Sequence, residues 1–436
     1  MLSFIHLSDI HFRNHSGDSY DLDKDIRIEI LRDINEHAKD ELVEVAGILV
    51  CGDIAFSGKE EEYKNAINFL DDICSMLNIQ NERVYCVPGN HDLDQSIPQN
   101  SVSIMGLQDS LSNSLTQDKF DQLLANYCRN DTDGLLLFEP IKMYNKNFAG
   151  IFNCDISREK PFWNDAVPLS EKYTLFLNGM NSTTISNHKD HTFDSEEERQ
   201  MFLPTVQIPS RQQSNKAIFM TLCHHPPECW FDPENRLKNK LDSRVHLQLY
   251  GHKHIQTIKK EKNSIIINSG ATHPERSLSE WIPRYNWLTI DVINESNSDY
   301  LSIKIYPRIL EPTTTDHFIV DTEICIDSQF VEYKLKICEE ERIVPVQNEN
   351  MLFEEVTNPV QKLRIEELNG MTYKTFIYSF MSLPIVKRSA LLAQFSLITD
   401  EDDGKEHYEI AELVIERAKN SGCIVQIWDE IEKWRK

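Results

Sequence analysis

The chain has 436 residues, 40% of them hydrophobic and 26% charged, which suggests two or three domains with buried cores. Its formal net charge of −25 disfavours a long nucleic-acid duplex as a partner, although a local basic patch is not excluded. No apolar run approaches the roughly 20 residues that span a bilayer, and we see no signal-peptide pattern at the N-terminus. Ten cysteines without a CxxC pair are typical of free thiols, so we expect a cytoplasmic protein without a membrane segment.

The first hundred residues alternate between strand-like and helix-like patterns. Short apolar runs at Ser3–Leu7, Gly47–Cys51 and Val84–Val87 predict buried strands. Between them, Ile26–Lys39 and Glu60–Leu77 carry apolar residues at helical spacing. This strand–helix–strand–helix–strand order predicts an α/β fold with layered helices and sheet.

The rest of the chain falls into three further regions. Residues 98–160 are less regular and partly helical, so we interpret them as an insertion or cap. Six strand-like runs then follow: Thr174–Leu177, Ala217–Leu222, Val245–Tyr250, Ser264–Ile267, Trp287–Val292 and Tyr300–Tyr306. We therefore expect a catalytic domain at 1–310, a connector of uncertain structure at 311–365, and a separate helical unit at 366–436.

The helical unit shows four amphipathic segments. The first is Tyr373–Phe380, and the second begins after Ser382, with Pro384 in its first turn, and runs to about Leu397. A third segment, with apolar positions such as Ile410 and Val414, ends before Gly422, and a fourth follows to the C-terminus. Four such helices predict a small bundle, which either packs on the catalytic domain or binds a partner.

Polar side chains of metal-ligand type follow five of the predicted strands. The stretches are Asp9-Ile10-His11, Gly52-Asp53, Gly89-Asn90-His91-Asp92, His224-His225-Pro226-Pro227 and Gly251-His252-Lys253-His254. Strand ends in an open α/β sheet meet at one crevice, so these side chains can converge. Carboxylate, imidazole and amide oxygen suit divalent Mn, Fe, Zn, Co or Ni. If these segments are extended, residues two apart point the same way and can reach one ion.

Each stretch alone is weak evidence, but the five in this order resemble the calcineurin-like metallophosphoesterases. That family carries D-x-H, GD, GNH[DE], a histidine before proline, and GHxH, and residues 1–310 contain every element. The resemblance implies a four-layer α/β/β/α sandwich with two divalent metal ions. It also implies hydrolysis of a phosphoester by metal-activated hydroxide.

The resemblance further implies how the ligands divide. One ion would be held by Asp9, His11 and His254. The other would be held by Asn90, His224 and His252. Asp53 would bridge the two ions.

Four more residues are candidates beside the ligands. The resemblance implies that His91 faces the substrate and either protonates the leaving oxygen or stabilises the phosphoryl charge. It also implies that Asp92 orients His91. His225 packs beside His224 or contacts substrate. Asn181 follows a strand and either lines the pocket or is an ordinary turn residue.

Three functions remain open from the sequence. The stretches HHPP and GDIAFSG resemble the cyclic-nucleotide phosphodiesterase branch, which favours a nucleotide or similar small phosphodiester as substrate. The alternatives are a DNA or RNA nuclease, and a signalling adaptor with an inactive phosphoesterase scaffold. The C-terminal segment resembles the effector-associated domains of prokaryotic conflict systems, which implies a protein partner bound through 366–436 and a role in anti-phage defence.

Overall fold

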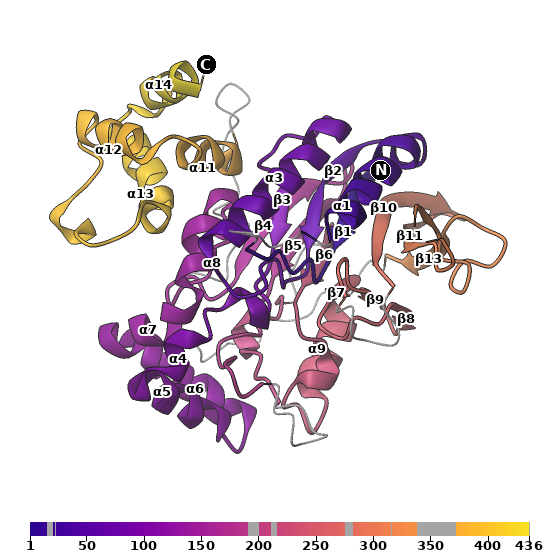
Figure 1. The fold of residues 1–436 in the computed structure, drawn as a ribbon, viewed down its shortest axis with the longest axis horizontal. Helices are drawn as coiled ribbons and strands as arrows, with labels where there is room; N and C mark the ends of the chain where they lie inside the picture. The colour runs from indigo at the N-terminus through magenta and orange to yellow at the C-terminus, as the bar shows by residue number, and fades with distance from the viewer. Residues whose placement is uncertain are drawn as a thin grey trace.

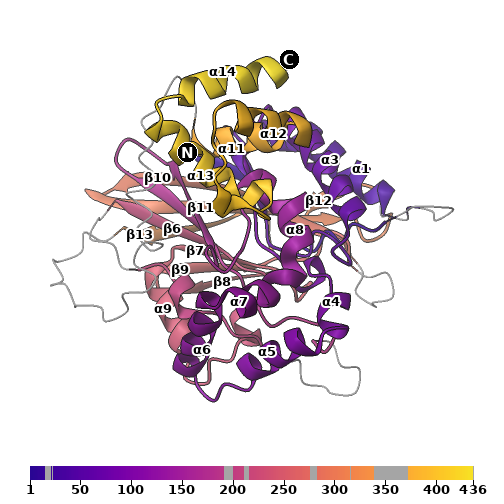
Figure 2. The same ribbon diagram turned by 90° about the vertical axis from the view of Figure 1, so that its left-hand side faces the viewer.

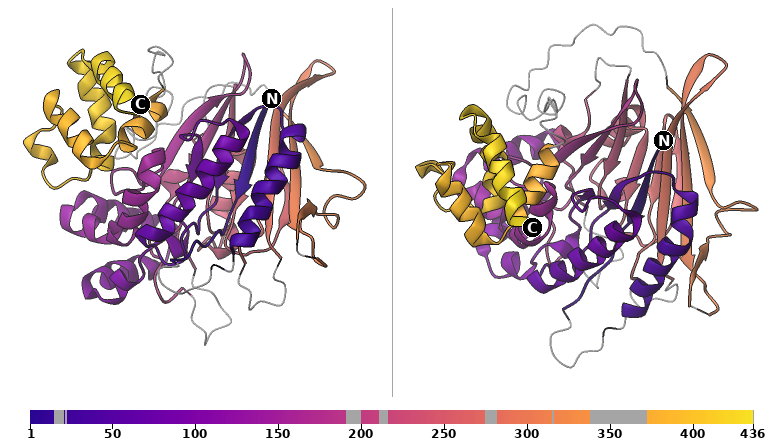
Figure 3. Two further views of the ribbon diagram at one scale, coloured as in Figure 1. Left: turned by 45° about the horizontal axis from the view of Figure 1, so that its top comes forward. Right: turned by 90° about the horizontal axis from the view of Figure 1, so that it is seen from above.

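Two β-sheets lie face to face at the centre of the molecule, with helices on both outer sides (Figures 1 and 2). The computed structural model describes residues 1–14, 21, 23–190, 200–210, 216–274, 282–314, 316–337 and 372–435. A group of C-terminal helices sits at one end of the molecule (Figure 3). This arrangement confirms the four-layer α/β/β/α sandwich with a C-terminal helical module.

The first sheet has seven strands in the order β12-β11-β10-β1-β2-β3, with β13 also pairing with β11. Its strands are β1 (Leu2–Leu7), β2 (Val45–Val50), β3 (Val84–Cys86), β10 (Arg284–Glu295), β11 (Ser298–Leu310), β12 (Phe318–Val320) and β13 (Val331–Lys336). The three N-terminal strands are parallel, and β10 runs antiparallel to β1. The carboxyl ends of β1, β2 and β3 therefore lie at one edge of the sheet.

The second sheet has six strands in the order β4-β5-β6-β7-β9-β8. They are β4 (Trp163–Pro168), β5 (Thr174–Gly179), β6 (Ala217–Leu222), β7 (Leu247–Tyr250), β8 (Thr257–Glu261) and β9 (Ser264–Asn268). Strands β5, β6, β7 and β9 are parallel, and β4 and β8 are antiparallel edges. The parallel strands explain the apolar runs of the sequence, since both their faces are covered.

Helices cover the outer face of each sheet. The first sheet carries α1 (Lys24–Asp33), continued by the π-helix η1 (Ile34–Ala38) and α2 (Lys39–Glu41), and α3 (Glu60–Leu77). The second carries α9 (Arg236–Arg244), whose apolar residues share a buried cluster with those of β7 and β9. The main core lies between the sheets, where side chains of β1, β2 and β10 meet those of β5, β6 and β7.

Residues 98–160 are more completely helical than the sequence indicates. They form α4 (Ser96–Gln99), α5 (Val102–Ser112), α6 (Gln117–Arg129), α7 (Asp131–Phe138), η3 (Glu139–Ile141), α8 (Lys142–Asn147) and η4 (Ala149–Phe152). Phe120 of α6 stacks on Phe202 with ring centroids 4.5 Å apart, so α5–α7 cap the helical side of the second sheet. Trp163 is buried and donates from Nε1 to the Cys86 carbonyl oxygen at 2.7 Å, which assigns it to the core.

The C-terminal module contains α11 (Tyr373–Met381), α12 (Ile385–Gln394), η7 (Asp400–Asp402), α13 (His407–Asn420) and α14 (Ile424–Arg435). Its helices share an apolar cluster, which Ile151 of η4 joins from the catalytic domain. Lys374 is buried at this junction, with its ammonium 4.0 Å from the Tyr85 ring centre on β3. The module is thus docked on the sandwich through α11.

Strand pairing continues beyond residue 310, because β12 and β13 both pair with β11. Part of the segment expected to be a connector thus belongs to the first sheet, while 338–371 lies outside the described residues. No disulfide joins the cysteines that the structure describes. In the same part of the chain no single helix is long and apolar enough to cross a membrane, and only the pair α11–α12, bent by 119°, has the length and composition together.

Candidate metal centre

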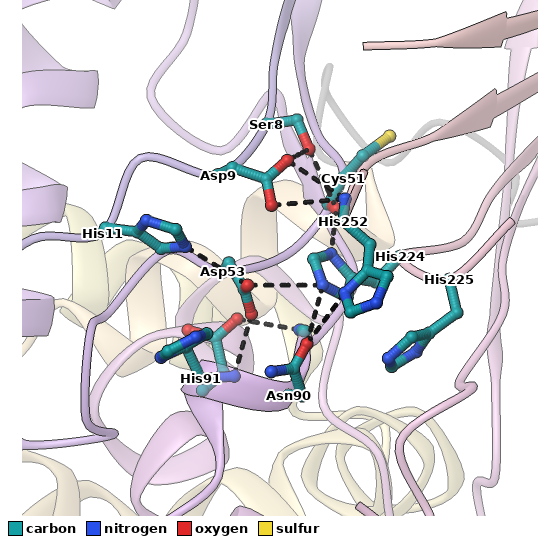
Figure 4. Close-up of polar contacts among 12 residues, drawn as sticks. Ser8, Asp9, His11, Cys51, Asp53, Asn90, His91, His224, His225 and His252 are labelled. Atoms are coloured by element: carbon teal, nitrogen blue, oxygen red, sulfur yellow. Dashed lines mark hydrogen bonds and ion pairs between the residues drawn. The ribbon is translucent and has the colours of Figure 1, made fainter. Parts of the chain in front are cut away.

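The candidate site lies where the carboxyl ends of the two sheets meet. Asp9 follows β1, Asp53 follows β2, and Asn90 and His91 form a short 3₁₀ turn, η2 (Asn90–Asp92), after β3. From the second sheet, His224 follows β6 and His252 follows β7. Figure 4 shows these side chains pointing toward one another from distant parts of the chain.

The backbone at this site adopts an unusual conformation. Five of the predicted ligands have left-handed φ angles: Asp9 (52°), His11 (51°), Asp53 (50°), His252 (69°) and His254 (56°). The expectation that the D-x-H and H-x-H segments are extended is therefore wrong, and tight left-handed turns aim the side chains instead. Such conformations are costly for residues other than glycine and cluster at functional sites.

The first candidate ligand group comprises Asp9, His11 and His254. The ligand atoms of the three residues lie within 4.8 Å of one another. Asp9 Oδ1 is 3.3 Å from His254 Nε2. The Asp9 carboxylate is fully buried and accepts hydrogen bonds from the Ser8 hydroxyl at 2.5 Å and the His252 amide at 3.2 Å. These bonds fix the orientation of the carboxylate.

The second group comprises Asn90, His224 and His252. Asn90 Oδ1 lies 3.1 Å from His224 Nε2 and 3.2 Å from His252 Nδ1. His224 Nδ1 is 2.9 Å from the Cys51 carbonyl oxygen, which can only accept, so Nδ1 carries a proton. When His224 is neutral, its Nε2 lone pair would therefore face the site, as metal-ligating histidines require.

Asp53 lies between the two groups. Its Oδ2 is 3.2 Å from His11 Nε2 of the first group and 3.3 Å from His224 Nε2 of the second. Its Oδ1 accepts the His91 backbone N–H at 2.8 Å. One carboxylate is thus shared by ligand candidates from both sides, which is the placement expected of a bridge.

The donor set fits divalent cations. Two nitrogen or oxygen ligands of one ion, each about 2.1 Å from it, lie roughly 3.0–3.4 Å apart, as the paired atoms do here. Without an ion, burial alone would raise the pKa of Asp53, but His224 and His91 hold it well below its usual range. Burial alone would lower the pKa of His224, yet Asp53 raises it to about 9. Without ions, protons on the histidines balance the negative charge of the carboxylates. Bound cations would displace those protons.

The orientation of His91 differs from the expectation. His91 Nδ1 donates to the Phe56 carbonyl oxygen at 2.8 Å. The Asp92 carboxylate instead accepts the amides of Gly89 (2.9 Å), Ala55 (2.9 Å) and Ile54 (3.2 Å). Asp92 therefore pins the two loops that carry Asp53 and Asn90, and the hydrogen bond of His91 Nδ1 goes to Phe56 instead.

Two further predicted residues lie on the His224 side. His225 is buried, its Nδ1 is 2.8 Å from the Ser182 hydroxyl, and its ligand atom groups with those of His224 and His252. Asn181 is also buried, but its side chain bonds Thr183 and Thr184 of its own loop. The structure brings His225 to the site and gives Asn181 the contacts of a turn residue.

Two glycines leave room for the ligands. A Cβ atom at Gly89 would stand 2.1 Å from Asp53 Oδ1, and one at Gly251 would stand 2.1 Å from Ser8 Oγ and 2.8 Å from Asp9 Oδ2. Both contacts are far inside van der Waals range. The glycines of the GNHD and GHKH stretches therefore serve close packing against the carboxylates.

Sequence reasoning missed several supporting residues. The His273 amide donates to the Asp9 carbonyl oxygen at 3.1 Å, and the His273 ring donates to the Ile10 carbonyl oxygen at 2.5 Å. The Thr272 amide likewise bonds the Ser8 carbonyl oxygen at 2.9 Å. These contacts hold the left-handed turn at Asp9, and no local motif could have disclosed them, because they join segments about 260 residues apart in the chain.

Solved structures similar to this chain are distant. Zinc-complexed Vps29 from Entamoeba histolytica is 11% identical, covers 77% of this chain and 99% of that one, and has a TM-score of 0.28. A conserved Streptococcus pneumoniae protein predicted to be a phosphoesterase is 13% identical (76% and 97% covered, TM-score 0.26). A putative 5'-nucleotidase from Staphylococcus aureus is 10% identical (82% and 58% covered, TM-score 0.31). No curated protein matches.

Two family models match the sequence. The GTPase-associated adaptor domain matches residues 372–433, which supports the resemblance of the C-terminal helices to an adaptor module. The calcineurin-like phosphoesterase model matches residues 2–256 and so includes every element of the five-part motif. That match spans more than half of the chain, which therefore belongs to the calcineurin-like phosphoesterase family.

Proposed function

We propose that the chain is a phosphodiesterase that holds two divalent metal ions and hydrolyses a nucleotide or a similar small phosphodiester. The observation that carries the proposal is the position of Asp53 Oδ2, 3.2 Å from His11 Nε2 and 3.3 Å from His224 Nε2. A buried carboxylate shared in this way is well suited to bridge two cations and costly without them.

The ligand roles follow from the two groups. Asp9, His11 and His254 would hold one ion, and Asn90, His224 and His252 the other, with Asp53 common to both. The ions, when bound, would lower the pKa of a water and withdraw charge from the phosphoryl oxygens.

His91 is the catalytic residue of the proposal. Its backbone N–H donates to Asp53 Oδ1 and its ring Nδ1 donates to the Phe56 carbonyl oxygen, and these two bonds fix the ring beside the candidate ligands. An imidazolium held this way can donate a proton to the leaving oxygen or stabilise charge on the phosphoryl group. Asp92 acts as a positioning residue, because it ties the loops of Asp53 and Asn90 together through backbone amides.

The substrate class is proposed from composition and resemblance. The net charge of −25 disfavours long duplexes, and the HHPP stretch resembles the cyclic-nucleotide branch of the family. We further propose that residues 372–435 recruit the enzyme to a protein partner, because their sequence matches an adaptor domain. A role as an effector in bacterial conflict or anti-phage defence would follow from such recruitment in the cytoplasm.

The test combines metal analysis with turnover of bis-p-nitrophenyl phosphate. Protein reconstituted with Mn²⁺ should hydrolyse the diester, and His91→Ala should lower kcat by about 10²–10⁴-fold while still binding metal. His317→Ala, at an exposed histidine remote in sequence from every motif, is the matched control and should leave kcat unchanged.

Other outcomes separate the alternatives. Metal-loaded protein that cleaves neither this diester nor small nucleotides would support the inactive scaffold and contradict the proposal. Cleavage of single-stranded oligonucleotides with far higher kcat/KM than of mononucleotides would favour a nuclease.

A further inference from the structure

Among the residues that the structure describes, Arg13 beside the candidate site has no ion-pair partner. Its side chain is exposed, and its guanidinium carbon lies 3.5 Å from the centre of the Phe56 ring. We propose that Arg13 and Phe56 form a subsite that binds a second phosphate group of the substrate, apart from the phosphoester held at the metal centre. The proposal rests on the proposed function and narrows its substrate to phosphodiesters that carry a further terminal phosphate.

The backbone places this pair at the edge of the site. The chain after His11 runs beside the chain after Asp53, with the Phe56 amide donating to the Phe12 carbonyl oxygen at 2.9 Å. The Phe56 ring stacks on the His91 ring with centroids 5.2 Å apart and meets the His11 ring at 6.1 Å. One aromatic ring therefore touches a candidate ligand, the candidate catalytic residue and the guanidinium.

Within the described part of the chain, the Arg13 guanidinium lies against the Phe56 ring. No carboxylate among the residues that the structure describes lies within 4 Å of its guanidinium, whereas Arg158, Arg284 and Arg417 each pair with an aspartate. A guanidinium lying over an aromatic ring still presents its N–H groups in its own plane. The stack thus restricts the side chain without using its hydrogen bonds.

A phosphate group is the ligand that this geometry suits. Guanidinium binds phosphate through two parallel hydrogen bonds, and a side chain held on a ring loses less freedom on binding than a mobile one. In a chain with a net charge of −25, an exposed arginine that pairs with no carboxylate among the described residues marks a local site for an anion. Because His91 and Phe56 are in contact, one small substrate can reach both the metal centre and Arg13.

Two thymidine dinucleotides provide a matched test. TpT contains one phosphodiester, and pTpT adds a 5'-terminal phosphate to the same diester. For the wild type we expect kcat/KM for pTpT to exceed that for TpT at least tenfold at low salt, and the advantage to shrink as salt is raised. Arg13→Gln should bring the pTpT/TpT ratio close to one, and Arg13→Lys should retain part of it. Arg32→Gln, at an exposed arginine of α1, is the control and should keep the wild-type ratio.

A binding measurement separates this inference from the proposed function. Calorimetric titration of both dinucleotides into catalytically impaired His91→Ala should show tighter binding of pTpT, and the double variant with Arg13→Gln should lose that difference. Equal affinities for pTpT and TpT, or a preference that survives Arg13→Gln, would overturn the subsite even if bis-p-nitrophenyl phosphate is hydrolysed. Failure to hydrolyse any diester, with the binding preference intact, would instead refute the proposed function alone.

Discussion

Asp53→Asn is the substitution that probes the centre most directly. The change keeps the shape of a side chain that is 2% exposed but removes the charge shared by His11 and His224. Partners outside the ligand shell already contribute 10–100-fold to metal affinity, so loss of a bridging carboxylate should weaken both ions at least 100-fold. The variant should therefore lose two ions together.

The weaker metal binding of Asp53→Asn should appear as a smaller metal-dependent stabilisation in thermal unfolding. An ion present at 100 times its Kd stabilises the fold by about 2.7 kcal/mol, and a 100-fold weaker site leaves only about 0.4 kcal/mol. The difference, roughly 2.3 kcal/mol per ion, corresponds to about 5–9 °C in Tm for a domain of moderate size, and to about twice that for two ions. The assay compares the Tm of metal-free and Mn²⁺-loaded protein and measures bound metal in the same samples.

Asn90→Ala serves as the matched comparison. Asn90 Oδ1 lies 3.1 Å from His224 Nε2 and 3.2 Å from His252 Nδ1, so its loss should remove the ion on that side of the centre and about half of the metal-dependent Tm shift. If Asp53→Asn retains one ion and behaves like Asn90→Ala, the shared role of Asp53 is wrong.

Two further substitutions test the packing around the site and the docking of the module. Gly89→Ala should abolish metal binding and diester hydrolysis without unfolding the protein, because the added methyl would stand 2.1 Å from Asp53 Oδ1; full activity would contradict the close packing. Lys374→Ala should lower the free energy of unfolding by about 1–3 kcal/mol and speed proteolytic release of the C-terminal helices, because Lys374 is buried against Tyr85. Lys433→Ala, 69% exposed, is its control, and equal protease resistance of both variants would contradict docking through α11.

The sequence predicted the parts of the fold that depend on local pattern. Apolar runs located β6 (Ala217–Leu222) to the residue, because a strand buried on both faces is a continuous apolar segment. Edge strands were missed because they lack such a continuous apolar segment. β8 (Thr257–Glu261) has a half-exposed, lysine-containing sequence that shows no apolar run.

The candidate ligands could be predicted because each lies directly after a strand, in a recognisable spacing. Their backbone conformation could not, since the left-handed φ angle at Asp9 depends on tertiary contacts such as the His273 hydrogen bonds. The hydrogen-bond partner of the His91 ring could not be predicted for the same reason. Adjacency in sequence suggested Asp92, whereas the fold supplies the carbonyl of Phe56 from another loop.

The central claim is that seven side chains surround a pair of cations. Anomalous diffraction from crystals grown with Mn²⁺, recorded on both sides of the manganese absorption edge, tests it most directly. We predict two peaks, one bounded by Asp9, His11 and His254 and the other by Asn90, His224 and His252, with the Asp53 carboxylate between them. A single peak, or peaks remote from Asp53, would contradict the account.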